Sequence, residues 1–296
     1  MANLTYARGR WMNLDKPGGA VFFVGGGTPA FKGVGRSNSY SGLTPEEPLS
    51  TIAQGVTNCV DGRGDTIVLL PGSVTVTTAI AMSKTDVTLS GVEPNGSINP
   101  SGILVNANAI DGIAVTAANV VIEDLHFPAG TTAANASRID AGAAGLTVRN
   151  CTFECGAHDP ETITIPAAGL HTHILNNRFY ITVDGPDAAI EIQSASAHYI
   201  NIIGNVFHGM EDSPSWDDAA IHSTVAHIDC LVKGNTSTFG VAIKFTAAAK
   251  GMISDNDMGE GTLGSMLDPG SCMCTRNFEA DAIDQKAREF PTTAAS

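Results

Sequence analysis

The sequence is poor in charge, in aromatic residues and in basic side chains. Only 16% of its 296 residues are charged and 6% are aromatic, and 16 Lys and Arg stand against 30 Asp and Glu. A net charge of −14 repels a phosphate backbone, so we do not expect the chain to bind nucleic acid. The two Trp and four Tyr also leave few candidates for exposed aromatic binding platforms.

Long hydrophobic runs are missing as well. No stretch of 18 or more apolar residues occurs, which excludes a transmembrane helix and predicts no contact with a membrane. The first 15 residues include Arg8, Arg10 and Trp11 and lack the apolar segment of a secretory signal peptide. We therefore expect a protein that is made and kept in a cytosol, or is packaged from one.

The six cysteines lack the spacing of metal ligands. Cys151 and Cys155 are separated by three residues, and Cys272 and Cys274 by one, whereas zinc sites typically separate paired cysteines by two. No metal and no other cofactor is therefore expected. A chain of this length does not need disulfide staples, so we expect buried free thiols, with disulfides as the alternative.

What the sequence does contain is an internal repeat. A six-residue pattern opens with an apolar residue, usually has Asn, Asp or Gly third, often has Asn fourth, and usually closes with an apolar residue. Its copies span Ile122–Phe127, Val148–Phe153, Ile174–Phe179, Ile202–Phe207, Val232–Ser237, Ile253–Met258 and Met273–Phe278. Asn and Gly tolerate the left-handed backbone conformation of a sharp corner, so the pattern predicts a strand, a tight turn and a second strand.

Stacking one copy per coil places equivalent residues in columns. We expect a ladder of hydrogen-bonded amides at the fourth position and a stack of aromatic rings at the sixth. The expected ladder is Asn177, Asn205, Asn235 and Asn256, and the expected stack is Phe127, Phe153, Phe179 and Phe207. The leucine spacing of leucine-rich repeats is absent, and a propeller blade needs about 40 residues. The repeat thus predicts an all-β chain folded as a single right-handed parallel β-helix of about nine or ten coils.

Three segments are predicted along the chain. Residues 1–35 read as an N-terminal arm, residues 36–279 as the β-helix, and residues 280–296 as a C-terminal cap or tail. A capping helix is expected to begin at Thr44, with Pro45 at its first position. Residues 280–290 are expected to form a second helix or an extended tail, because the open ends of a stacked sheet need covers.

Two segments near the N-terminus resemble the opening of pectate-lyase-like β-helix proteins. These are Ser39–Ile52, which in that superfamily leads into the capping helix, and Gly64–Gly72, which forms a strand of the first coil. With the six-residue copies, the resemblance extends from about residue 36 to 279. The resemblance implies the fold but does not indicate one function, because the superfamily contains lyases, hydrolases, epimerases, phage tailspikes and non-catalytic virion proteins.

A second repeat brings polar side chains together. Ala189–Ile192, Ala220–Ser223 and Ala242–Phe245 share a pattern that predicts the same strand in three successive coils. Because side chains alternate across a strand, the third residue of each copy is expected to face outward in one column. The column is Glu191, His222 and Lys244, with Thr164 and Asp140 as its continuation, and Asp184, Asp187, Asp217 and Asp218 lie at the preceding turns.

Two interpretations of this column remain open. As an enzyme, the chain would use Glu191, His222, Asp217, Asp218 and Lys244 as an acid–base cluster, with Trp216 as the nearest aromatic side chain. As a structural protein, it would use the same charges to stabilise the sheet face. The polygalacturonase-like motifs include a Gly-His-Gly that this chain lacks, and the clustered calcium carboxylates of pectate lyases are not evident, which favours the structural interpretation.

The sequence therefore predicts a non-enzymatic structural component of a tailed-phage virion, either a head decoration or a small spike protein. The alternative is a polysaccharide lyase or glycoside hydrolase that acts on an extended glycan. Small or apolar outward residues such as Ala114, Ala143 and Val183 favour side-by-side packing, and we expect a homotrimer. Residues 1–35 are expected to dock onto a capsid or tail protein, in a virion assembled in the host cytoplasm.

Overall fold

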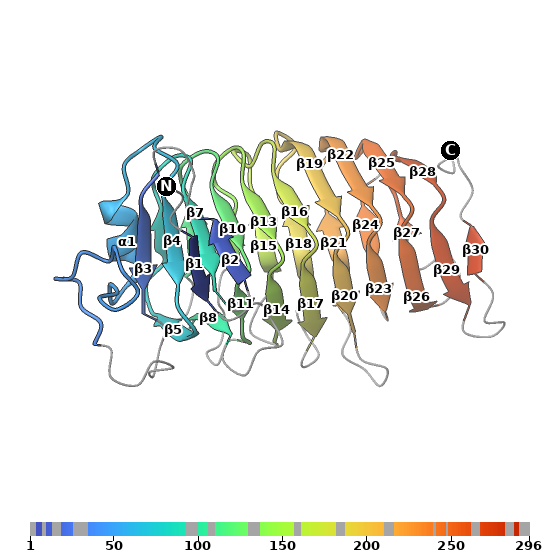
Figure 1. The fold of residues 1–296 in the computed structure, drawn as a ribbon. Coiled ribbons are helices and arrows are strands. Elements are labelled where there is room, and N and C mark those ends of the chain that lie inside the picture. The colour runs from blue at the N-terminus through green and yellow to red at the C-terminus, as the bar shows by residue number, and fades with distance from the viewer. Residues whose placement is uncertain are drawn as a thin grey trace.

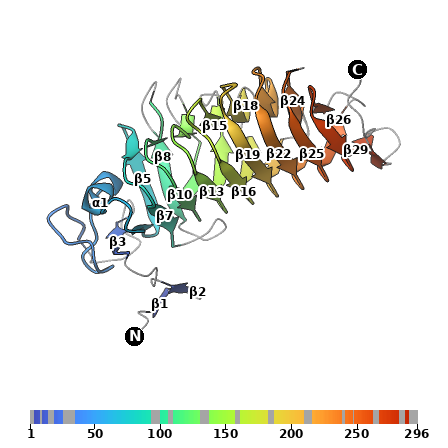
Figure 2. The same ribbon diagram turned by 90° about the horizontal axis from the view of Figure 1, so that it is seen from above.

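The computed structural model consists of stacked parallel strands that form one elongated solenoid (Figure 1). It describes residues 4–7, 10–13, 19–25, 35–92, 100–105, 110–129, 137–156, 161–181, 187–209, 216–238, 241–246, 248–261, 267–281 and 287–289. Three long sheets run along the solenoid, and each strand pairs with the equivalent strand of the coils before and after it. Turned by 90°, the strands are seen to step regularly from one end of the molecule to the other (Figure 2).

The first sheet has ten strands. In spatial order they are β3 (Val21–Val24), β4 (Thr66–Leu69), β7 (Thr88–Gly91), β10 (Val121–Glu123), β13 (Thr147–Arg149), β16 (His173–Leu175), β19 (His198–Ile203), β22 (Ile228–Lys233), β25 (Gly251–Ser254) and β28 (Met273–Thr275). All of their pairings are parallel. Each strand therefore belongs to a separate coil.

The second and third sheets complete the coils. The second contains β5 (Gly72–Val76), β8 (Ser101–Val105), β11 (His126–Phe127), β14 (Thr152–Cys155), β17 (Arg178–Ile181), β20 (Val206–His208), β23 (Thr236–Thr238), β26 (Asp257–Gly261), β29 (Phe278–Asp281) and β30 (Ala287–Glu289). The third contains β6 (Ile80–Met82), β9 (Ile113–Val115), β12 (Ser137–Asp140), β15 (Glu161–Ile165), β18 (Ala188–Ile192), β21 (Ala219–Ser223), β24 (Ile243–Phe245) and β27 (Leu267–Asp268). β1 (Leu4–Ala7) and β2 (Arg10–Asn13) form a separate antiparallel pair. The predicted all-β parallel solenoid is confirmed.

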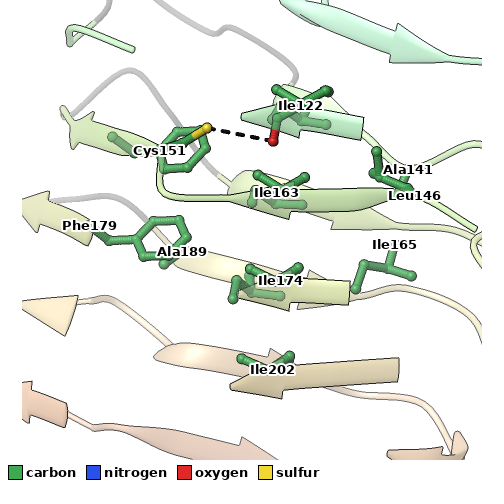
Figure 3. Close-up of a cluster of buried hydrophobic side chains, with 14 of the residues drawn as sticks. Ile122, Ala141, Leu146, Cys151, Ile163, Ile165, Ile174, Phe179, Ala189 and Ile202 are labelled. Atoms are coloured by element: carbon green, nitrogen blue, oxygen red, sulfur yellow. Dashed lines mark hydrogen bonds between the residues drawn. The ribbon is translucent and has the colours of Figure 1, made fainter. Parts of the chain in front are cut away.

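The six-residue repeat forms the corner between the first and second sheets. Its first residues pair in register from coil to coil, as Figure 3 shows for Ile122, Ile174 and Ile202. The third residues have φ between 54° and 68°, in the left-handed region that the pattern predicted. They are Asp124, Asn150, Asn176, Gly204, Gly234 and Asp255.

The last copy of the repeat begins one residue later than predicted. Ile253 pairs with Cys274, not with Met273, and Arg276 takes the left-handed corner position with φ 48°. Met273 is instead 55% exposed on the outer face. Both residues are apolar, so the pattern alone did not separate the two registers, and the one-residue shift reverses which side chain faces the core.

The fourth residues of the repeat form a buried amide ladder. Asn177, Asn205, Asn235 and Asn256 are each less than 5% exposed, and the corrected register adds Asn277 to the end. The Asn205 Oδ1 accepts hydrogen bonds from the backbone N–H and the Nδ2 of Asn177, at 2.9 and 3.0 Å. Its own Nδ2 donates to the Ile174 carbonyl and to the Asn235 Oδ1. The ladder thus satisfies backbone groups that the sharp corner removes from the sheet.

The sixth residues form an aromatic stack inside the solenoid. The Phe127, Phe153, Phe179 and Phe207 rings lie at centroid distances of 4.7, 4.9 and 5.0 Å, with interplanar angles of 9° to 12°. In the next coil Ser237 takes the place of the ring. Its hydroxyl is buried, has no hydrogen-bond partner among the described residues, and borders a cavity of about 10 Å³, room for one water molecule.

We expect the Ser237→Val variant to be more stable than the wild type by about 1 kcal/mol, because two methyl groups fill this cavity and a buried unpaired hydroxyl is removed. Urea unfolding followed by circular dichroism measures the difference. Thr236→Val, on the outer side of the same strand, is the matched control and should change the free energy of unfolding by less than about 0.5 kcal/mol. A destabilised Ser237→Val would indicate that a bound water holds the hydroxyl.

The helix α1 (Ile52–Asn58) covers the first coil, but it begins later than predicted. Its N-cap is Thr51, whose side chain accepts a hydrogen bond from the Gln54 N–H. The segment after Thr44 forms a turn instead, in which the Glu47 N–H donates to the Thr44 carbonyl at 3.3 Å. Leu49 then makes a single parallel bridge, and its N–H donates to the Phe23 carbonyl at 2.8 Å. Pro48 also disfavours a helical conformation in the residue before it.

Residues of the predicted arm contribute a strand to the solenoid. β3, within residues 1–35, pairs with β4 over Val21–Val24, so the boundary predicted at residue 36 leaves out the edge strand of the first sheet. At the other end, β29 and β30 pair antiparallel, which gives an extended and not a helical conformation for Ala287–Glu289. That strand covers the last parallel edge of the second sheet.

The cysteines are free and buried, as predicted. Burial raises the pKa of the Cys59 and Cys151 thiols to about 12 and that of Cys274 to about 11. In the described part of the chain, no helix is long and apolar enough to cross a membrane.

Candidate functional site

The polar column predicted on the third sheet is formed by residues paired across neighbouring strands. Glu191 of β18 pairs with His222 of β21, and His222 pairs with Lys244 of β24. Thr164 and Asp140 precede Glu191 in the same column, and Asp268 follows Lys244. The structure therefore brings together the side chains that the second repeat singled out.

His222 occupies the middle of this column, between two carboxylates. Its Nδ1 lies 3.8 Å from the Glu191 Oε1 and 3.6 Å from the Asp218 Oδ2, and its side chain is only 7% exposed. Both distances exceed a normal hydrogen bond, so the contacts are electrostatic. The Lys244 Nζ donates to the Asp218 Oδ1 at 3.2 Å, and the Gln193 Nε2 donates to the Glu191 Oε2 at 2.9 Å.

Glu161 adds a carboxyl group that the sequence patterns did not reveal. Burial and the neighbouring Glu191 carboxylate, which also forms a hydrogen bond with it, raise the pKa of Glu161 to about 7, with further contributions from Asp187 and Asp218. Burial and the nearby Asp217 and Asp218 raise the pKa of Asp187 in the same way. Close carboxyl groups cannot all ionise without cost, so this cluster retains a proton near neutral pH.

A second acidic group lies on the preceding coils of the same sheet. Burial and the Asp111 carboxylate raise the pKa of Asp140, which is partly offset by a hydrogen bond from Thr164. Asp111 itself accepts a hydrogen bond from the Ser137 hydroxyl at 2.7 Å. The third sheet thus carries acidic side chains over several coils.

The remaining predicted residues are placed differently. Trp216 is 2% exposed and belongs to the core, so it cannot serve as an exposed platform beside the cluster. Asp217 is exposed, and Asp184 lies outside the described residues. No group of three or more His, Cys, Asp or Glu among the described residues could hold a metal ion.

Glu161 was missed because its strand position carries no repeated polar residue. It pairs with Ala188, and Ala188 pairs with Ala219, so the next coils show only alanine there. The alternation of inward and outward side chains also breaks in β18, since Ala189 and Ile190 are adjacent yet both belong to the core. The one signal available in the sequence was a charged residue at a position where the next two coils have alanine. Such an isolated charge does not repeat from coil to coil, so the search for repeats did not find it.

The pH dependence of stability should report this cluster. Glu161 has a raised pKa in the folded chain, so the folded state holds a proton that the unfolded state loses above about pH 4.5. The wild type should therefore lose stability as pH rises from about 4.5 to 7. Glu161→Gln should remove this part of the slope and stabilise the protein at pH 8 by about 1 kcal/mol, allowing for solvent screening. Chemical denaturation at pH 5 and pH 8 tests this, and an unchanged slope in the variant would contradict it.

Comparisons with known proteins identify the fold. No known protein family matches the chain, and the curated proteins include no similar sequence. Among solved structures, the chain is similar to pectate lyase Pel9A, with a TM-score of 0.51, 12% identity, and coverage of 90% of this chain and 78% of that one. The fold is a right-handed parallel β-helix. This confirms the predicted fold and its handedness.

Two other solved structures are similar to this β-helix at lower scores. A PL6 alginate lyase in complex with a trisaccharide has a TM-score of 0.41 and 12% identity, over 82% of this chain and 62% of that one. ORF18 of Geobacillus virus E2 has a TM-score of 0.43 and 13% identity, over 94% and 67%. A fold of this kind does not determine a function, so the function of this β-helix has to be argued from its own residues.

Proposed function

We propose that this β-helix is a non-enzymatic structural component of a tailed-phage virion, either a head decoration or a small spike protein. The observation that carries the proposal is the internal pairing of the polar column. His222 is enclosed between Glu191 and Asp218, and Lys244 donates to Asp218. Charges engaged with one another across neighbouring strands stabilise a sheet face and leave less freedom for proton transfer to a substrate.

The construction of the solenoid supports the same proposal. The amide ladder from Asn177 to Asn277 and the stack from Phe127 to Phe207 lock successive coils to one another. Each coil contacts its neighbours, so the molecule is a rod whose stiffness comes from repetition. We propose that residues 1–35, which contain β3 at one end of this rod, attach it to a capsid or tail protein.

The test is the protein composition of particles produced by the phage that encodes the chain. Particles purified on a density gradient should contain the chain at a fixed ratio to the major capsid protein, measured by quantitative mass spectrometry. Removal of residues 1–18, before the β3 strand, should abolish incorporation while the purified variant keeps its circular dichroism spectrum. Absence of the wild-type chain from intact particles would overturn the proposal.

One observation favours a second function, glycan cleavage. Glu161, whose pKa is raised to about 7, shares a hydrogen bond with Glu191, and a carboxyl group with a raised pKa can serve as a general acid in glycan cleavage. Release of reducing ends or unsaturated products from a panel of acidic and neutral polysaccharides tests it. Activity that is lost in Glu191→Gln or His222→Ala and kept in Asp268→Asn, at the end of the same column, would establish an enzyme. No cleavage by the wild type would dismiss this second function.

We also propose that the chain assembles as a homotrimer. Side-by-side association of rods gives closed cyclic symmetry when the same faces meet around one axis. Three chains bring together a net charge of three times −14, so the contact surface must avoid the acidic third sheet. Of the apolar outward residues expected to favour packing, Ala114 and Ala143 are partly buried, and Val183 lies outside the described residues.

A further inference from the structure

Exposed apolar side chains gather on one face of the solenoid. Eight large apolar residues are exposed among those described, and four of them lie on β19, β22, β25 and β28 of the first sheet. They are Tyr199 (52% exposed), Ile228 (39%), Met252 (36%) and Met273 (55%). Those four strands are consecutive neighbours in the sheet, and Met252 pairs with Met273. Tyr199 and Ile228 lie at the adjoining corner, where Tyr199 has φ 59°.

Further apolar side chains lie in two columns of outward residues on the same sheet. In the first, Leu231 pairs with Met252, and Met252 pairs with Met273. In the second, Leu175 pairs with Ile203, and both are partly exposed. The resulting apolar face consists of Leu175, Tyr199, Ile203, Ile228, Leu231, Met252 and Met273. A continuous exposed apolar surface of this kind marks an interaction site.

The apolar face also differs from the rest of the chain in charge. Lys233, paired with Ile203, is the charged residue within it, and Arg149, paired with Leu175, borders it. Two carboxylates lie at the corners that border it, Asp229 and Asp255, and Asp255 is bound by the Arg276 guanidinium at 2.6 Å. Burial and the nearby His171 lower the pKa of His173, which lies in the same column as Leu231 and Met252.

The charge distribution indicates which partner fits this surface. Two copies of a chain with a net charge of −14 repel each other wherever acidic faces meet, and the third sheet carries such a face. At the apolar face the same two copies would meet with few carboxylates and with unbranched methionines that adapt to a facing surface. Depletion of charge and enrichment of apolar residues are what the cores of homo-oligomer interfaces show.

We infer that the apolar face of the first sheet is the surface through which copies of this chain associate side by side. The inference rests on the self-association proposed above and names the residues that carry it. The face spans consecutive coils toward the C-terminal end, so association leaves the N-terminal end of the rod, where β3 and α1 lie, available for other contacts (Figure 1).

Light scattering coupled to size exclusion tests the inference with three proteins. The wild type should have a mass of about three times 30.5 kDa at micromolar concentration. Met252→Lys with Met273→Lys should weaken association by at least about 100-fold and give a monomer, because the two lysines of each chain would be buried in the assembly without partners. Leu43→Lys with Val60→Lys is the matched control, since these residues are also exposed and apolar, at 55% and 48%, but lie away from the face.

Each outcome has a definite meaning. Met252 and Met273 are exposed, so both double variants should keep the circular dichroism spectrum of the wild type. Ile228→Lys with Met252→Lys provides a second disruption of the same face. A wild-type monomer at every concentration and salt would overturn the inference. An oligomer that persists in both face variants would also overturn it, whereas absence of the chain from phage particles would affect the virion proposal alone.

Discussion

The Asp65→Asn variant is expected to lose about 3 kcal/mol of stability, because Asp65 ties together the first coil and its cap. The Asp65 side chain is completely buried. One carboxylate oxygen accepts from the Ala20 N–H at 2.7 Å and from the Arg63 Nε at 2.6 Å, and the other accepts from the Val60 N–H and the Arg63 Nη2. An amide in its place presents donors to these donors and leaves buried groups unpaired.

The contribution of Asp65 to the stability of the folded protein should also depend on pH. Burial by itself raises the pKa of Asp65, but the hydrogen bonds from Arg63, Val60 and Ala20 outweigh it and hold the pKa below its usual value. A carboxyl whose pKa is lowered by folding stabilises the protein above its unfolded pKa, near 3.9, and this stabilisation is lost as pH falls further. Below about pH 4 the wild type should therefore approach the stability of the Asn variant.

Urea unfolding at pH 7 and pH 3 measures both effects. Asp61→Asn is the matched control, because Asp61 is an exposed carboxylate of the same turn that accepts from the Thr85 N–H and hydroxyl. Its substitution should cost clearly less than that of Asp65. Equal losses in the two variants at pH 7 would contradict the role assigned to burial.

The second large effect is expected at the centre of the amide ladder. Asn205→Ala should destabilise the protein by about 3 to 5 kcal/mol, because it leaves the Asn177 N–H and the Ile174 carbonyl without partners inside the core. It also removes the bond to the Asn235 amide oxygen, which joins this coil to the next. Thermal or urea unfolding of the purified variant gives the difference.

Asn201→Ala is the control for this change. Its amide contacts the His173 ring at 2.9 Å on the outer face of the sheet, where water can replace the lost partner, so the cost should stay below about 1 kcal/mol. If Asn205→Ala unfolds at the same urea concentration as Asn201→Ala, the ladder contributes specificity of register and not stability.

The sequence predicted those parts of the fold that are repeated in it. Asn205 and Phe179 could be placed because equivalent residues recur at the same point of the six-residue pattern. Aligning these recurring residues fixes which residues pair between neighbouring coils. Cys274 could not, since its apolar neighbour Met273 fits the first position of the pattern equally well. The start of α1 depended on the long-range pairing of Leu49 with Phe23, which no local signal contains.

The candidate site shows the same limit. Glu191, His222 and Lys244 were predicted as one column because they occupy the same position in three similar segments. The burial of His222 was not predictable, since its side chain is only 7% exposed beside Asp218, which precedes its own strand, and Glu191, which lies on the neighbouring strand. Glu161 stands opposite alanines, so its raised pKa follows from a contact that the repeat does not encode.

The six buried thiols can report where along its length the solenoid opens. They are distributed from the first coil, at Cys59, through Cys151, Cys155 and Cys230, to the last coil, at Cys272 and Cys274. A thiol whose pKa is raised by burial reacts with an alkylating reagent only when its coil separates from its neighbours. In a chain whose stability is summed coil by coil, opening costs least at the ends. The order in which the cysteines become labelled therefore traces how far fraying travels inward from each end.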